Sequence, residues 1–190
     1  MRPREGSPAV QLKTERLELR PFSPEAIDAL LHHDGAALAG LVTGHFPEPP
    51  RPPALMEDIL PRMRNRVRAE PSEAPWWAWT IVDSATHEVV GMLGMAGPPD
   101  FEGAVLLGYS IYEEFQGRSY ASEAVRALAE WALAQPGVSV VRATIPHSHE
   151  ASVRVAEKAG LRRAGRQADP QWGEVAVYEL RKAGGVTRAD

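Results

Sequence analysis

A glycine and an arginine precede a helix-like segment in the middle of the chain. The stretch is Ile111-Tyr112-Glu113-Glu114-Phe115-Gln116-Gly117-Arg118-Ser119-Tyr120-Ala121-Ser122-Glu123-Ala124. A turn with free backbone N–H groups that leads into the positive end of a helix dipole is well suited to bind phosphate. Gly117 removes a side chain from such a turn and Arg118 adds a cation. The pattern indicates an anion site, and an ordinary turn between a strand and a helix explains it equally well.

Histidines and glycines elsewhere offer no comparable pattern. His32-His33 and His147-x-His149 have no cysteine or carboxylate partner at a metal-ligand spacing. His149-Glu150 lacks the second histidine of a zinc-protease helix, because Val153 occupies that position. The nucleophile elbow of hydrolases and the phosphate loop of nucleotide hydrolases are absent from the sequence. We therefore expect no metal site and neither of these two chemistries.

The composition is that of an ordinary folded chain. A length of 190 residues indicates one domain, and 44% apolar residues exclude a wholly disordered chain. The absence of cysteine excludes disulfides and cysteine nucleophiles. With 21 basic and 25 acidic residues the net charge is −4, which argues against nucleic acid as a partner. No stretch is apolar enough to span a membrane and the start lacks a signal-peptide core, so we expect a cytoplasmic protein without a membrane partner.

Hydrophobic periodicity predicts the elements that must position the anion site. Apolar residues recur every third or fourth position in the expected helices, and they alternate or run together in the expected strands. The predicted strands cover residues 11–21, 76–82, 89–95, 105–112, 138–145, 163–168 and 174–180, and the predicted helices cover residues 24–31, 55–70, 121–132 and 151–159. Five prolines within residues 46–53 predict a stiff extended loop.

The resulting order is β-α-α-β-β-β-α-β-α-β-β. A meander followed by alternating strands and helices predicts an α/β (α+β) fold, a mixed sheet of about seven strands flanked by about four helices. The domain covers residues 11–181, with flexible tails at residues 1–10 and 182–190. Ligands of such sheets bind at the carboxyl ends of strands, which is where the junction after Ile111 lies.

Three stretches resemble the GNAT N-acetyltransferases. Gln116 to Ala121 resembles motif A, Gln/Arg-x-x-Gly-x-Gly/Ala, which binds the pyrophosphate of acetyl-CoA in that family. Thr14 to Arg20 and Glu150 to Leu161 resemble the Rim-type branch, and the predicted element order is also that of the family. The resemblance covers roughly residues 11–181. It implies an enzyme that uses acetyl-CoA as cosubstrate to acetylate a primary amine on a peptide N-terminus, an amino acid or a small molecule.

The resemblance also implies the residues of the site. The implied cofactor-binding residues are Ile111, Tyr112, Glu113, Gln116, Gly117, Arg118, Ser119, Tyr120, Ala121, His149 and Ser152. Ser152 matches the serine that Rim-type enzymes place near the sulfur, where a hydroxyl can stabilise the leaving thiolate. His149 stands where the family often has asparagine.

Besides His149, two further positions and the pair Leu106 and Leu107 depart from the family pattern. Ser119 replaces the central glycine, which strains the loop by about 1 kcal/mol if that position needs a positive φ. Ala156 stands where many members have a tyrosine as general acid. Leu106 and Leu107 occupy the neighbourhood of the glutamate that often serves as base.

The departures leave the catalytic base and the activity open. Glu113 is a candidate base, as are Glu150 and His147, and a water relay to solvent is the remaining route. The alternative function is a catalytically weak or inactive module that binds acyl-CoA or a protein partner. The chain is either a monomer or a homodimer.

Three aromatic residues and a basic run are candidates for the acceptor side. Trp172 lies in a predicted turn, and one of Trp76 and Trp77 must point out of the core if their strand is regular. Arginines alternate with other residues from Arg62 to Arg68, a pattern typical of a solvated helix face and also compatible with the lip of a site for anionic substrates.

Overall fold

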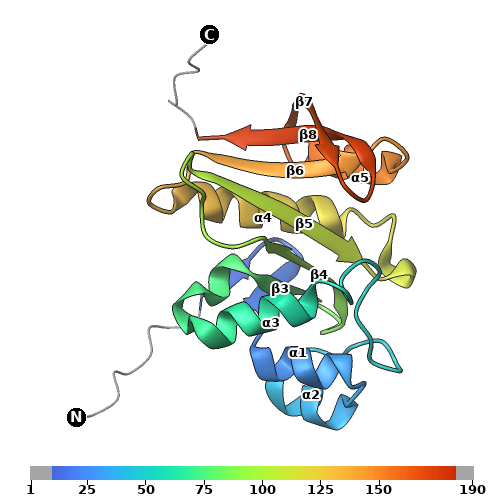
Figure 1. The fold of residues 1–190 in the computed structure, drawn as a ribbon. Helices are drawn as coiled ribbons and strands as arrows, with labels where there is room; N and C mark the ends of the chain where they lie inside the picture. Colours follow the sequence, from blue (N-terminus) through green and yellow to red (C-terminus); the bar gives the residue numbers. More distant parts are fainter. Residues whose placement is uncertain (1–9, 183–190) are drawn as a thin grey trace, which may run out of the picture.

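One mixed sheet of eight strands forms the centre of the molecule, in the order β1-β2-β3-β4-β5-β6-β8-β7 (Figure 1). The computed structural model describes residues 10–182, so the predicted flexible tails lie almost wholly outside the described residues. The strands are β1 (Leu12–Lys13), β2 (Leu17–Pro21), β3 (Ala78–Asp83), β4 (Val89–Met95), β5 (Ala104–Ile111), β6 (Val140–Pro146), β7 (Arg162–Asp169) and β8 (Gly173–Arg181). The helices are α1 (Pro24–Leu31), α2 (Gly35–Leu41), α3 (Leu60–Ala69), α4 (Tyr120–Ala134) and α5 (Glu150–Lys158), with short 3-10 helices at Pro71–Trp76 and Glu113–Phe115.

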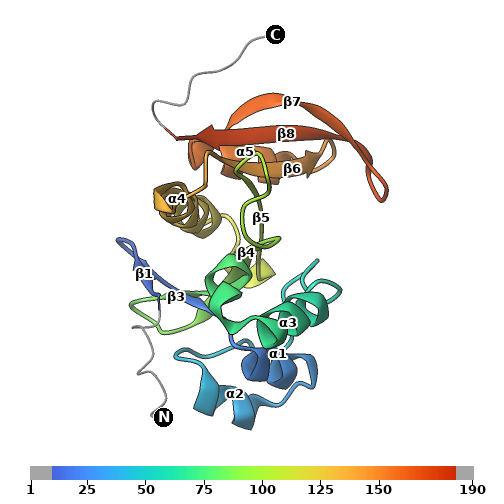
Figure 2. The ribbon, with the colours of Figure 1, turned by 60° about the vertical axis from the view of Figure 1, so that its left-hand side comes forward.

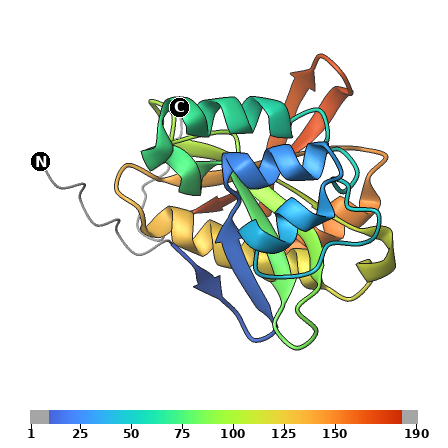
Figure 3. The same ribbon diagram turned by 90° about the horizontal axis from the view of Figure 1, so that it is seen from below.

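Helices cover both faces of the sheet. On one face α1, α2 and α3 pack around Trp77, Ala78 and Met92. On the other face α4 and α5 pack against the larger core, in which Trp79 is fully buried. Figure 3 shows α3 and α4 on opposite sides of the strands. Ala78 and Trp79 belong to different cores because successive residues of a strand point to opposite faces, whereas Trp77 lies just before β3.

The sheet splits at its centre. All neighbouring strands are antiparallel except β5 and β6, which pair in parallel over only Ala104–Leu106 and Val140–Arg142. Beyond these residues β5 diverges from β6 toward its carboxyl end (Figure 1), and Figure 2 shows β6, β7 and β8 turned away from β1 and β3. The split therefore opens an edge of β5 inside the sheet.

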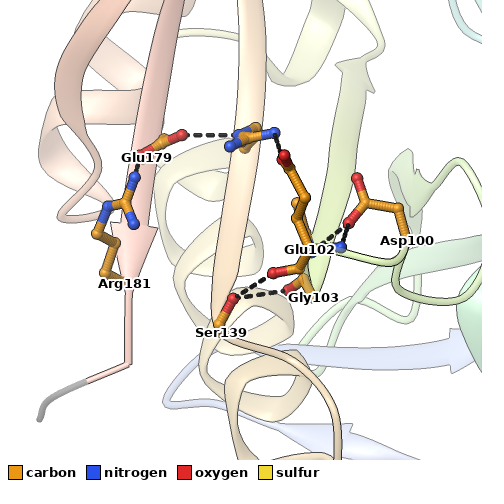
Figure 4. A network of polar contacts seen from close by, with 8 residues as sticks. Asp100, Glu102, Gly103, Ser139, Glu179 and Arg181 are labelled. Carbon is orange, nitrogen blue, oxygen red and sulfur yellow. Dashed lines mark hydrogen bonds and ion pairs between the residues drawn. The ribbon is translucent and has the colours of Figure 1, made fainter. Parts of the chain in front are cut away.

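A polar network holds the two strands together at the closed end of the split (Figure 4). The Arg142 guanidinium donates from Nε to Glu179 Oε1 at 2.7 Å and lies 3.7 Å from Glu102 Oε2. The Ser139 hydroxyl lies within hydrogen-bond distance of the carbonyl oxygens of Glu102 and Gly103, at 3.0 and 3.2 Å. These contacts link the residues before β5 to the start of β6, at the end of the pair opposite the opening.

The predicted class and the single domain-sized sheet are confirmed, but the first strand is two strands. Residues 14–16 form a turn in which the Leu17 N–H donates to Thr14 Oγ1 at 2.9 Å and the Thr14 N–H donates to the Leu17 carbonyl at 2.9 Å. The apolar alternation continues through this turn, which is why one strand over residues 11–21 was the wrong prediction. The sheet consequently has eight strands rather than about seven.

The N-terminal helices also differ from the prediction. The helix α2 is additional, so five α-helices flank the sheet rather than about four. It begins at Asp34, whose carboxylate accepts from the Ala37 N–H at 2.9 Å, whereas Gly35 and Gly40 weaken the helical signal in the sequence. The helix α3 begins at Leu60 instead of residue 55, because residues 54–59 form turns.

The start of the second predicted strand is wrong as well. Pro71–Trp76 form a 3-10 helix, and β3 begins only at Ala78. Pro75 has no N–H to donate to a strand ladder, which favours this outcome. Trp76 therefore leaves the strand and packs on Trp131 of α4, with ring centroids 5.2 Å apart. The remaining predicted elements are confirmed to within about two residues at each end.

Candidate functional site

The loop between β5 and α4 has the backbone of an anion site. Gly117 and Ser119 have positive φ values of 77° and 63°, and they flank Arg118. Turns that mix left- and right-handed residues gather N–H groups into a concave row that binds anions. Ser119 is the N-cap of α4 and gives no side-chain hydrogen bond to the helix. The first N–H groups of α4 are therefore available to a ligand.

Ser119 has the positive φ that was expected to strain the loop. Its backbone, φ 63° and ψ 13°, lies in the left-handed region. A residue with a Cβ atom pays about 1 kcal/mol there relative to glycine. The serine therefore keeps the shape of the loop at a cost in stability.

A cavity of about 370 Å³ adjoins this loop and is called the basic cavity below. One wall is the loop with the carboxyl end of β5, and the other is α5. Its charged lining residues are Arg118, Arg154 and Lys158, and among the described residues no carboxylate lines it. The cavity is suited to an anionic ligand, because three cations line it and no carboxylate of the described residues does.

Most residues implied by the family resemblance line the basic cavity. They are Ile111, Gln116, Gly117, Arg118, Ser119, Tyr120, Ala121 and Ser152. Tyr112 and Glu113 line neither this cavity nor the second one described below. The Tyr112 N–H donates to the Val90 carbonyl at 3.1 Å, and its hydroxyl donates to the Arg51 carbonyl at 2.5 Å. Both donors of Tyr112 are thus used inside the protein.

Tyr120 contributes to the cavity through its backbone, because its side chain is occupied elsewhere. Its hydroxyl donates to Asp83 Oδ2 at 2.6 Å, and Asp83 Oδ1 accepts from the N–H groups of Ala85 and Thr86. Burial acts to raise the pKa of Asp83, but the hydrogen bonds outweigh it and hold the pKa below its ordinary value. The bond to Asp83, together with burial, raises the pKa of Tyr120. The pair anchors the first residue of α4 to the β3–β4 turn.

The opened edge of β5 presents backbone groups to the split. The Ala96 N–H donates to the Leu106 carbonyl and the Tyr112 N–H donates to Val90, so the even-numbered residues of β5 face β4. Because N–H groups alternate along a strand, those of Tyr109 and Ile111 face away from β4. The Gln116 side chain already donates to the Ile111 carbonyl at 3.0 Å. No residue of β6 is in register with this part of β5.

A second cavity, of about 440 Å³, lies on the other side of the split and is called the acidic cavity below. Its walls come from residues 55–63, the splayed ends of β5 and β6, and the β7–β8 turn. Asp58 and Asp169 line it, and among the described residues no lysine or arginine does. His149 lines this cavity rather than the basic one, and its ring lies edge-on to Trp172 with centroids 5.3 Å apart. Trp172 thus lies at a cavity, as the sequence analysis proposed.

The two cavities meet at Leu55, Tyr109 and Ser152, which line both. The Tyr109 hydroxyl donates to the Ser152 carbonyl at 2.9 Å, which ties β5 to the first turn of α5. Burial raises the pKa of Tyr109 to about 12, so the phenol stays protonated near neutral pH. A reaction between an anionic and a cationic ligand has its meeting point here.

Five of the polar residues that line these cavities were not among the site residues predicted from the sequence. Arg154 and Lys158 follow Ala151 at spacings of three and seven residues, which places them on the same face of α5. That spacing was a readable signal. Tyr109 alternates with Ile111 along β5, which is a weaker signal. Asp58 and Asp169 belong to no motif.

The other candidates have different partners. His147 lies 3.3 Å from Glu174, and Glu150 lies 3.6 Å from Arg154. Within residues 10–182, no three histidine, cysteine or acidic residues gather as a metal site would require. None of the helices in this same range is long and apolar enough to cross a membrane.

Comparisons with known proteins now decide the family. The model of the acetyltransferase (GNAT) domain matches residues 16–162. The chain belongs to the GNAT family. The predicted family and the assignment as an N-acetyltransferase are therefore confirmed. The chain is 28% identical to the uncharacterized N-acetyltransferase YjdG of Bacillus subtilis (strain 168) over 152 residues, which are 80% of this chain and 89% of the relative.

Solved structures of GNAT proteins have the same fold. A GNAT-family acetyltransferase from Bacillus anthracis superimposes with a TM-score of 0.63 at 20% identity, covering 91% of this chain and 99% of that one. RimL, a ribosomal L7/L12 alpha-N-protein acetyltransferase solved in complex with coenzyme A, superimposes with a TM-score of 0.62 at 16% identity, covering 90% and 98%. Rim-type enzymes are thus among the fold neighbours of this GNAT chain.

Proposed function

We propose that this GNAT protein transfers an acetyl group from acetyl-CoA to a primary amine by direct attack of the amine on the thioester. One observation carries the proposal. A basic cavity and an acidic cavity open on opposite sides of the split sheet and meet at Tyr109 and Ser152. The first suits the phosphates of the cofactor, and the second suits the acceptor amine.

The cofactor side is supported by the groups that line the basic cavity. Arg118, Arg154 and Lys158 offer charge to phosphates, and the left-handed turn at Gly117 and Ser119 offers backbone N–H groups. The opened edge of β5 offers the N–H groups of Tyr109 and Ile111 to an amide-bearing arm, as a strand offers them to a neighbouring strand. The residues therefore fit coenzyme A in charge and in hydrogen-bonding type.

The reaction needs few protein groups at the meeting point. When bound, acetyl-CoA supplies a thioester whose carbonyl carbon forms a C–N bond with the amine as the C–S bond breaks. Ser152 donates a hydrogen bond to the leaving sulfur, and Tyr109 holds Ser152 in place through its carbonyl. The ammonium form of the amine must lose one proton before attack, and the C–N product loses a second as the thiolate gains one.

Water is the proposed route for the amine proton. Glu113, Glu150 and His147 line neither cavity. A general base must lie within hydrogen-bond reach of the proton it removes, directly or through one water. The acidic cavity opens to solvent, so a chain of water molecules can carry the proton away. On this proposal no single side chain abolishes the activity as a base.

Calorimetry with coenzyme A and an assay of free thiol release test the proposal together. Arg154→Gln and Lys158→Gln remove charge from the basic cavity, and Arg163→Gln removes the same charge from exposed β7. We expect the first two to weaken coenzyme A binding by roughly twofold to fivefold each, and the third to leave it unchanged. Absence of binding by the unmodified protein would overturn the cofactor assignment. Tight binding without thiol release from any amine would instead indicate a non-catalytic acyl-CoA module.

A further inference from the structure

The acidic cavity collects most of the exposed apolar side chains of the molecule. Six large apolar residues are exposed within residues 10–182, and four of them line this cavity. They are Leu55, Ile59, Leu106 and Trp172, exposed by 61%, 40%, 44% and 44%. Exposed apolar side chains that gather in one concave surface mark a binding site rather than incidental exposure. A ligand of this cavity therefore presents an apolar body.

The charges of the same cavity are all of one sign. Asp58 comes from the loop before α3, and Asp169 is the last residue of β7. Asp169 Oδ1 accepts from the backbone N–H groups of Gln171 and Trp172 at 2.9 Å each, so the carboxylate is fixed against the backbone of the β7–β8 turn. The Oδ2 atom of Asp169 has no hydrogen-bond partner among the described residues. The carboxylates attract a cation, and no cation of the lining can hold a carboxylate of the ligand.

The third property is the size of the cavity. Its volume of about 440 Å³ lies in the lower part of the range of small-molecule sites. From these properties we infer that the acceptor is a small primary amine on an apolar, uncharged body, and that free amino acids are poor acceptors. This inference rests on the proposed acetyl transfer. The carboxylates gather the protonated amine, and the apolar walls hold its body while the nitrogen reaches Ser152.

Matched amines test separately the discrimination against a negative charge and the preference for an apolar body. Phenylalaninamide and phenylalanine share an amine and a ring and differ in the negative charge. Phenylalaninamide and glycinamide share an uncharged amide and differ in the apolar body. We expect kcat/KM for phenylalaninamide to exceed both of the other values by at least about tenfold. Equal values for phenylalaninamide and phenylalanine, or for phenylalaninamide and glycinamide, would overturn the inference.

Variants of the two aspartates test whether they cause the discrimination against the negatively charged amine. Asp169→Asn keeps a carbonyl oxygen for the Trp172 N–H but removes the charge, and Asp58→Asn removes the other charge. Glu57→Gln is the matched control, because Glu57 is exposed in the same loop and does not line the cavity. We expect both aspartate variants to narrow the preference for phenylalaninamide over phenylalanine by roughly threefold or more, and the control to keep it. An unchanged preference in both aspartate variants would overturn the electrostatic part.

An assay with a peptide acceptor distinguishes failure of this inference from failure of the proposed function. If a peptide with a free N-terminus is acetylated faster than phenylalaninamide, the acceptor class inferred here is wrong while the acetyl transfer stands. If no amine or peptide releases thiol from acetyl-CoA, the proposed function itself fails. A rate that is highest for phenylalaninamide supports both.

Discussion

Glu123 of α4 binds Arg16, which precedes β2, through both oxygens of its carboxylate. Glu123 Oε2 accepts from Arg16 Nε at 2.8 Å and lies 2.7 Å from Nη2, while Oε1 accepts from the Arg16 backbone N–H at 3.0 Å. Arg16 also donates from Nη1 to the Arg118 carbonyl at 3.2 Å, and its guanidinium lies over the Tyr120 ring. The β1–β2 turn thus contacts the backbone of the proposed pyrophosphate loop through Arg16.

Removing this contact should weaken cofactor binding without touching the basic cavity. We expect Arg16→Ala to lower the free energy of unfolding by about 0.5–1 kcal/mol, because the exposed guanidinium loses its ion pair with Glu123 and its hydrogen bond to the Arg118 carbonyl while the backbone N–H bond remains. We also expect a severalfold weaker affinity for coenzyme A, measured by calorimetry. Lys13→Ala, which removes an exposed cation paired with Glu18 on the same hairpin, is the control. Normal affinity in the folded Arg16→Ala protein would show that the loop does not depend on Arg16.

The Glu123 carboxylate should make the free energy of unfolding depend on pH. Burial acts to raise the pKa of Glu123, but the hydrogen bonds from Thr14 and Arg16 outweigh it and hold the pKa below its ordinary value. A lowered folded pKa gives stability that is complete above the unfolded pKa and is lost as the pH falls through the folded pKa. We expect the unfolding free energy of Glu123→Gln to fall less than that of the unmodified protein as the pH is lowered from about 6 to about 3. Denaturant titrations at several pH values measure this difference. Parallel acid curves would contradict the assigned shift.

Local signals explain which parts of the fold and site were predictable. The loop from Gln116 to Ala121 is set by contiguous residues, so its motif was enough to predict a turn that leads into a helix. The spacing of Arg154 and Lys158 on α5 was also a local signal, but neither was among the predicted site residues. The turn at Thr14 was missed because its hydroxyl closes the turn while Glu123, more than a hundred residues away, holds it. Residues in such contacts carry no mark of their partner in the sequence. Prediction therefore followed the apolar alternation through the turn.

The acceptor side shows the same limit. Asp58 in a loop and Asp169 at the end of β7 lie far apart in the sequence, and both line one cavity at the split of the sheet. The split begins where the pairing of β5 and β6 stops, after Leu106 and Arg142. Periodicity predicts that strands exist, but it does not state where two strands part. The turn that leads into α4 was therefore predictable, and the residues of the acidic cavity were not.

Ser119 offers a test in which stability and function should improve together. Ser119→Gly removes the Cβ atom from a left-handed position, so we expect a gain of about 1 kcal/mol in unfolding free energy. Coenzyme A affinity should rise as well, because the loop holds its binding shape without strain. Ser119→Ala keeps the Cβ atom and is the matched control, with no gain. Loss of affinity in Ser119→Gly would indicate that the hydroxyl itself contacts the ligand.

Substitution of Gly117 should lower stability or coenzyme A affinity, in contrast to Ser119→Gly. A Cβ atom at this position meets nothing within 4 Å, so Gly117→Ala creates no clash, but its φ of 77° is unfavourable for alanine. We expect a loss of about 1 kcal/mol in stability or a shift of the loop that weakens coenzyme A binding. Unfolding curves and calorimetry distinguish the two. If neither changes, the left-handed turn is not what shapes the site.

Gly94 carries a structural prediction for the acceptor wall. A Cβ atom there would lie 2.3 Å from the Trp77 carbonyl oxygen, closer than the backbone of β3 and β4 can allow. We expect Gly94→Ala to lower the free energy of unfolding by about 2 kcal/mol or more, because strands rather than a flexible side chain must move. Gly165→Ala is the control, since the same atom on β7 meets nothing within 4 Å. Comparable unfolding curves for the two variants would show that the strands yield easily.

Tyr109 should act on the rate through Ser152 rather than on either ligand. In Tyr109→Phe the Ser152 carbonyl loses its hydrogen bond, so the serine is held less firmly where the cavities meet. We expect kcat to fall by roughly threefold to tenfold with little change in KM for acetyl-CoA, whereas Ser152→Ala lowers kcat at least as much. Because burial raises the pKa of Tyr109 to about 12, the unmodified enzyme should keep its rate as the pH rises to about 10. A double variant no slower than Ser152→Ala alone would show that the two residues act as one unit, and additive losses would contradict it.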